Sequence, residues 1–142
     1  MAKYDKYFLT EKDGIIQKGM NPAVVHKIIK ADMGLLGPDF GIGWHPITKP
    51  FKMIDVSHKH AYGQVLAFIP GDITKMGELD AEIEFYLDGE KHIITRTTVI
   101  HIPGGMIHCP LYINRVGKPF LFNNMYFTAE YIQEKVEKKM NK

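Results

Sequence analysis

The chain has 142 residues, of which 45% are hydrophobic and 24% charged, and its formal net charge is +2 at pH 7. This length and composition are typical of one globular domain with a sizeable core. The small net charge favours neither nucleic acid nor an anionic membrane surface as a partner. No apolar run approaches the roughly 20 residues that a membrane span needs, so we expect no membrane segment.

The single cysteine, Cys109, excludes an intrachain disulfide and is typical of a reducing compartment. The N-terminal residues lack the apolar run of a signal peptide. We therefore expect a cytoplasmic protein. The sequence has no repeat and no low-complexity linker, so we predict one domain over 1–142. Its parts are an N-terminal arm (1–39), a barrel (40–127) and a C-terminal helix (128–142).

The N-terminal arm begins with a polar stretch that carries a few aromatic side chains, and we expect these to pack on the body of the protein or on a second subunit. Asn21 and Pro22 then form a typical helix start, an N-cap followed by proline in the first turn. We predict a helix from here to Gly34, which would end it. The valines and isoleucines within this stretch favour a strand instead.

From residue 40 to residue 127 the sequence is typical of short β-strands separated by turns rich in glycine and proline. The clearest strand is 82–87, where apolar and polar residues alternate, followed by the hairpin signal Asp88-Gly89. Strands are also predicted at 40–47, 52–60, 64–69, 92–102, 107–114 and 120–127. Such a succession indicates an antiparallel sandwich or barrel.

The last residues depart from the β pattern. Thr128 is a plausible N-cap for a helix over 129–140, with Glu130 early and lysines late, as the helix dipole favours. Its apolar stripe, which includes Tyr131 and Ile132, would pack on the barrel or on a dimer partner.

Two histidines stand out within the predicted strands. His58 and His60 are separated by one residue, so on a strand their imidazoles point to the same side. A tight turn at Tyr62-Gly63 would fold Gln64 back beside them. Downstream, a Pro-x-Gly-x-x-His segment ends at His108 and offers a third imidazole. Because imidazole is the commonest ligand for divalent transition metals in proteins, this pattern predicts a metal site. Two exposed, unrelated histidines are the alternative interpretation of the first pair.

These segments resemble the two motifs of the cupin superfamily. The first motif is G-x5-HxH-x3,4-E-x6-G, to which the chain contributes His58, His60 and Gly71, with Gln64 in the glutamate position and Lys52 in place of the leading glycine. The second is G-x5-PxG-x2-H-x3-N, matched by Pro103, Gly105 and His108, with Thr97 and Tyr112 replacing the glycine and the asparagine. The resemblance covers roughly residues 50–127. It implies an all-β fold, the antiparallel double-stranded β-helix or jelly-roll barrel, here with a short C-terminal helix.

The resemblance also implies that His58, His60, Gln64 and His108 bind one divalent metal ion, for which Zn, Ni, Mn, Fe and Co all suit the donor set. Gln64 is the departure from the family pattern, because an amide oxygen carries no charge. Four neutral ligands leave the charge of the ion uncompensated, which favours an anionic small-molecule ligand and redox-neutral Lewis-acid chemistry over oxygen activation.

Other polar residues lie near the two motifs. Alternation from His108 places Tyr112 on the same face, where it would act as a catalytic phenol or be a buried core residue. Glu82 and Glu84 are expected to face solvent or a subunit contact, and Cys109 to be a small core residue. His45, His92 and His101 have no assigned role.

Several functions are compatible with this chemistry. The preferred hypothesis is a metal-dependent enzyme, an isomerase, lyase or decarboxylase, acting on a small carboxylate- or carbonyl-bearing molecule. The alternatives are a non-catalytic ligand-binding or sensor cupin, a metal-dependent dioxygenase, and a structural barrel without metal. We expect a homodimer, because sheets of this kind often pair.

Overall fold

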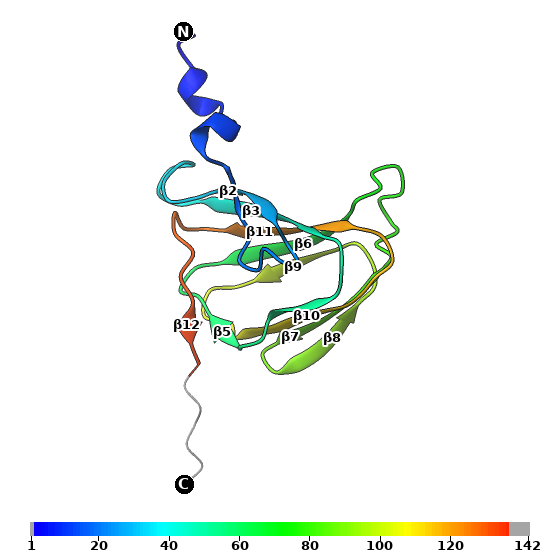
Figure 1. The fold of residues 1–142 in the computed structure, drawn as a ribbon. Helices are drawn as coiled ribbons and strands as arrows, with labels where there is room; N and C mark the ends of the chain where they lie inside the picture. Colours follow the sequence, from blue (N-terminus) through cyan, green and yellow to red (C-terminus); the bar gives the residue numbers. More distant parts are fainter. Residues whose placement is uncertain (1, 137–142) are drawn as a thin grey trace.

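The computed structural model describes residues 2–136, which form mainly two antiparallel β-sheets (Figure 1). The first sheet has the strand order β1 (Ile16–Lys18), β2 (Lys27–Ala31), β3 (Gly41–Ile47), β11 (Phe120–Tyr126), β6 (Gln64–Pro70) and β9 (Thr98–Ile102). The second has the order β12 (Glu134–Lys135), β5 (His58–Lys59), β10 (His108–Val116), β7 (Ala81–Leu87) and β8 (Glu90–Ile94), and β4 (Phe51–Ile54) also pairs with β10. Two short 3-10 helices, η1 (Asp5–Tyr7) and η2 (Glu11–Asp13), precede them. The predicted all-β antiparallel class is confirmed.

The hydrophobic core lies between the two sheets, because alternate residues of each strand point inward. On β7, Ile83 and Phe85 are buried whereas Glu84 between them is partly exposed. The facing sheet contributes Phe68 and Phe122, whose ring centroids are 5.3 Å apart. Between residues 2 and 136, no helix is long and apolar enough to cross a membrane.

The start of β10 breaks the simple alternation. Its register against β7 shifts between His108 and Leu111, so that His108, Leu111 and Ile113 are all buried. Tyr112 lies between two inward residues and therefore points to the outer face. The prediction that Tyr112 shares the face of His108 was wrong, because it assumed a strand without such an irregularity.

The predicted helix after Asn21 was also wrong. This segment contains β2, which pairs with β1 on one side and with β3 on the other. Ile28 and Ala31 are buried, and Ile29 between them is exposed. The segment forms a strand despite its helix-start residues, because β-branched side chains pack well on a pleated sheet.

The predicted C-terminal helix is likewise absent from residues 128–136, and residues 137–142 lie outside the described part of the chain. Instead, the segment runs extended along the edge of the second sheet, where β12 pairs with β5 (Figure 1). Two backbone hydrogen bonds hold its start, from Ala129 to Pro38 and from Met33 to Ala129. Pairing with the free edge of β5 replaces the hydrogen bonds that a helix would have made within itself.

We predict that Gly41→Ala destabilises the barrel. A Cβ at Gly41 would overlap the ring of Tyr126, which is 1% exposed and cannot easily move. Overpacking of this kind costs about 1–3 kcal/mol in the free energy of unfolding, which urea denaturation measures. Gly77→Ala is the matched control, because nothing lies within 4 Å of that position. Equal stability of the two variants would contradict the packing described here.

Candidate metal centre

Three histidines meet inside the barrel at the start of two neighbouring strands. His58 of β5 pairs directly with His108 of β10, and His60 follows two residues after His58. One ring nitrogen of each lies within 4.8 Å of those of the other two, and the side chains are only 1–2% exposed. Divalent metals with imidazole ligands need nitrogens gathered in this way around one point.

Each imidazole is held by a backbone carbonyl at its Nδ1 atom. The acceptors are the carbonyl of Val56 for His58 at 3.1 Å, that of Met106 for His108 at 3.0 Å and that of Ile132 for His60 at 2.5 Å. A carbonyl oxygen only accepts, so each Nδ1 carries the proton and each Nε2 keeps a lone pair. Metal-binding histidines are typically oriented by such bonds.

The electrostatics of the site keep the imidazoles neutral. Burial lowers the pKa of His58 and His60 below the usual value, and lowers that of His108 to about 4. Neighbouring histidines contribute further for His58 and His108, because one protonated ring disfavours a second. At neutral pH the site therefore presents unprotonated nitrogens.

Gln64, at the start of β6, is oriented by a neighbour in the same sheet. Its Nε2 donates a hydrogen bond of 2.6 Å to Oδ1 of Asn124 on β11. This contact assigns the two ends of the amide and leaves Oε1 as the free acceptor. The Gln64 side chain is 2% exposed. It lies close to the hydroxyl of Tyr131, which also contacts His58.

The donor set fits a metal ion. His60 Nε2, His108 Nε2 and Gln64 Oε1 are buried without a hydrogen-bond partner among residues 2–136. Buried polar atoms without partners are rare and costly, and here they belong to residues of one predicted ligand set. A divalent ion would satisfy all three atoms at once.

Tyr131 is a residue of this site that sequence reasoning missed. Its hydroxyl donates to His58 Nε2 at 3.4 Å, and its ring centroid is 4.8 Å from that of His60. Burial raises the pKa of Tyr131 to about 12, opposed by a hydrogen bond from Gln133. The helix prediction concealed Tyr131, since only the extended path of the segment carries its side chain into the barrel.

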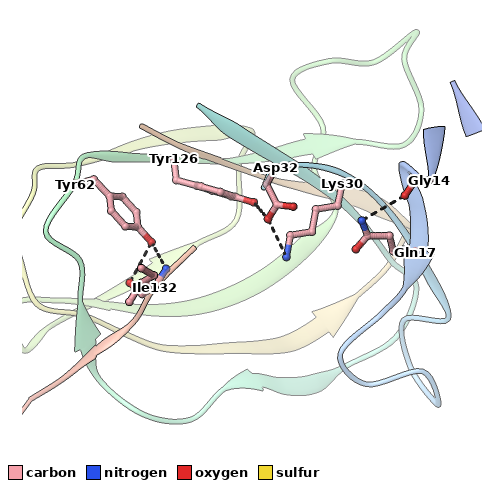
Figure 2. Close-up of polar contacts among 7 residues, drawn as sticks. All are labelled: Gly14, Gln17, Lys30, Asp32, Tyr62, Tyr126 and Ile132. Atoms are coloured by element: carbon pink, nitrogen blue, oxygen red, sulfur yellow. Dashed lines mark hydrogen bonds and ion pairs between the residues drawn. The ribbon is translucent and has the colours of Figure 1, made fainter. Parts of the chain in front are cut away.

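The same segment supplies the carbonyl that orients His60. Figure 2 shows the hydroxyl of Tyr62 beside the backbone of Ile132, where it accepts from the N–H at 2.8 Å and donates to the carbonyl at 3.1 Å. That carbonyl also accepts from His60. A residue 72 positions away in the sequence thus helps to fix one imidazole of the cluster.

The remaining sequence candidates are not part of the three-histidine cluster. Tyr112 donates to Asp55 at 2.5 Å on the outer face, and this bond raises its pKa to about 12. Glu84 accepts from Tyr86 on the same face. Cys109 is buried, as expected of a core residue. Of the unassigned histidines, His92 and His101 are exposed and His45 lines an interior cavity.

Comparison with known proteins identifies the fold. No protein-family model and no curated protein matches the chain. An RmlC-like cupin from Shewanella frigidimarina has a TM-score of 0.58 at 13% identity, covering 87% of this chain and 91% of that one. A protein with a double-stranded β-helix domain from Klebsiella pneumoniae has a TM-score of 0.57 at 15% identity, covering 97% and 98%. A Bacillus subtilis oxalate decarboxylase with Mn(II) centres has a TM-score of 0.52 at 9% identity, covering 80% and 29%. The chain has the cupin fold that its motifs indicated.

We predict that Tyr62→Phe weakens metal binding although Tyr62 is not a ligand. The change removes the hydroxyl that holds the Ile132 backbone and that itself lies 3.1 Å from His60 Nδ1, so His60 is less firmly oriented. Loss of such an orienting contact lowers metal affinity about tenfold, which isothermal titration calorimetry measures. Tyr86→Phe serves as control, since it removes a hydroxyl bonded to Glu84 on the outer face. Unchanged affinity in Tyr62→Phe, or equal losses in both variants, would refute the role of the Tyr62 hydroxyl in orienting His60.

Proposed function

We propose that the protein is a metal-dependent enzyme in which His58, His60, His108 and Gln64 bind one divalent ion. The observation that carries this proposal is the convergence of three neutral, enclosed imidazoles whose Nδ1 atoms are already occupied. Zn, Ni, Mn, Fe and Co are all compatible with nitrogen and amide-oxygen ligands. The Mn(II) centres of a decarboxylase with a similar fold support the same choice of metal class.

The substrate class follows from charge. Three imidazoles and one amide bring no negative charge, so the charge of a divalent ion would be balanced only by an anionic ligand. A bound ion supplies Lewis-acid polarisation of a carboxylate or carbonyl oxygen. Two residues of the chain orient the groups around that oxygen. Asn124 fixes the Gln64 amide, and Tyr131 places a hydroxyl beside His58. Isomerase, lyase or decarboxylase chemistry on a small carboxylate- or carbonyl-bearing molecule is therefore preferred.

A non-catalytic ligand-binding or sensor protein is the second candidate. It is favoured by Tyr131, whose side chain covers the histidines and whose hydroxyl already contacts His58 Nε2. A bound molecule would have to approach the ion past this side chain. Chemical conversion of a bound acid, followed by NMR, selects the enzyme, whereas tight binding without conversion selects the sensor.

The cytoplasmic location and the homodimer also belong to this proposal. Two aromatic side chains of the N-terminal arm, Tyr7 and Phe8, are 70% and 72% exposed. Exposed aromatic groups of this size support a second copy of the chain as a partner.

We predict that a divalent ion stabilises the protein and that His108→Ala abolishes this effect. An ion at 100 times its dissociation constant adds about 2.7 kcal/mol to the free energy of unfolding. Thermal denaturation with and without added ion measures it, and elemental analysis identifies the metal that copurifies. His101→Ala is the control, because His101 is exposed on β9. A protein that no divalent ion stabilises would overturn the proposed function.

We predict opposite effects for two changes at Gln64. Gln64→Ala removes an oxygen ligand and should lower metal affinity, whereas Gln64→Glu adds a carboxylate and should raise it. Because Gln64→Glu also cancels one positive charge, it should weaken binding of acetate to the metal-loaded protein about tenfold. Titration calorimetry with metal and then with acetate measures both. Full metal affinity in Gln64→Ala would exclude Gln64 as a ligand.

A further inference from the structure

A cavity of about 120 Å³ lies inside the barrel beside the candidate metal centre. Its apolar walls come from both sheets and include Met53 and Phe122. The polar side chains that line it include those of Lys30, His45 and Asn124. An apolar cavity with a few convergent polar groups is the usual form of a small-molecule site.

The cavity is lined by two residues that contact the metal centre, although none of the four proposed ligands lines it. Asn124 accepts a hydrogen bond from Gln64, and Tyr131, which also lines the cavity, contacts His58. A small molecule in the cavity would therefore lie against groups that contact two of the proposed ligands.

Lys30 also lines the cavity, two strands away from Asn124. Gly43 of β3 pairs with Asn124 on one side and with Lys30 on the other, so these residues share one row across the sheet. Neighbouring strands are about 4.8 Å apart, which separates the backbones of Asn124 and Lys30 by roughly 10 Å. The glycine leaves room for the ring of His45 above it, because a Cβ at Gly43 would lie 3.3 Å from His45 Nε2.

The ammonium group of Lys30 is held in place by its neighbours. Figure 2 shows the Tyr126 hydroxyl donating to Asp32 at 2.8 Å, with Lys30 Nζ 3.3 Å from the same carboxylate oxygen. The Asp32 side chain is 7% exposed and that of Lys30 is 32% exposed. Lys30 lines the cavity whereas the enclosed Asp32 does not, and the ion pair uses one of the three N–H donors of the ammonium.

His45 adds no second charge to the cavity. Burial, together with the positive charge of Lys30, lowers the pKa of His45 to about 4, so its ring is neutral at pH 7. Among the described residues that line the cavity, Lys30 is then the only charged one.

We propose, building on the function proposed above, that the protein takes a small dicarboxylate or a dianion of similar length. One carboxylate binds at the metal centre, and the other accepts hydrogen bonds from the Lys30 ammonium. A monocarboxylate would leave the Lys30 ammonium paired with Asp32 alone, without this second carboxylate. Lys30 is thus a specificity-determining residue, whereas the competing explanation gives it only a structural role as the partner of Asp32.

The test compares acids of equal carbon number on the metal-loaded protein by titration calorimetry. The pairs are malonate with propionate, succinate with butyrate, and glutarate with pentanoate. For at least one pair, the dicarboxylate should bind about tenfold more tightly, the fold-change that one charge-assisted hydrogen bond provides. The double variant Lys30→Met with Asp32→Asn removes both charges, so no buried carboxylate is left unpaired. It should lose this preference and keep its affinity for the monocarboxylate.

Lys27→Met is the matched control, because Lys27 lies on the same strand with its side chain exposed. It removes the same charge and should keep the preference. Lys30→Arg retains the ion pair with Asp32, so it provides a second test if the double variant does not fold. Because arginine reaches further into the cavity, it should shift the preference to a shorter dicarboxylate, and an unchanged length would count against the assignment.

The outcomes separate the two proposals. If monocarboxylates bind only in the presence of metal but no dicarboxylate is preferred, the role of Lys30 is wrong and the proposed function stands. A preference that survives in the double variant, or that is lost equally in Lys27→Met, overturns the role of Lys30 as well. If no carboxylate binds to the metal-loaded protein, the proposed function fails and the inference fails with it.

Discussion

The candidate site depends on hydrogen bonds from three imidazole Nδ1 atoms to backbone carbonyls. These bonds determine which nitrogen of each ring keeps its lone pair and where that lone pair points. Two of the carbonyls come from residues two positions before the histidine, so the local strand geometry provides them. The third comes from Ile132, so the site is complete only when the C-terminal segment lies along β5. Local and long-range structure are therefore joined at one cluster.

The barrel places two kinds of chemistry around one cavity. Imidazoles from the second sheet and an amide from the first gather beside Asn124 and Tyr131, which line the cavity, and a lysine held by a buried carboxylate lines it as well. The single row formed by Asn124, Gly43 and Lys30 connects them across the first sheet. This arrangement requires β2 to be a strand, because a helix at that position could not have set Lys30 in register with Gly43.

The sequence predicted those features that depend on short spacings. Alternation puts His58 and His60 on one side of a strand, and the Pro-x-Gly-x-x-His turn leads to His108, so the three-histidine cluster could be found without coordinates. Tyr112 was misplaced because a register shift in β10 cannot be read from residue types alone. Tyr131 was missed for a different reason. Its segment has good helix propensity, and only pairing with the distant β5 edge makes it extended.

The most direct test of the central claim is the X-ray absorption spectrum of the protein loaded with one equivalent of Zn²⁺. We expect three imidazole nitrogens at about 2.0–2.1 Å, with oxygen completing the coordination. The imidazole scattering should fall by one ligand in His108→Ala. A zinc ion surrounded mainly by water or carboxylate oxygens, or a spectrum that His108→Ala leaves unchanged, would contradict it.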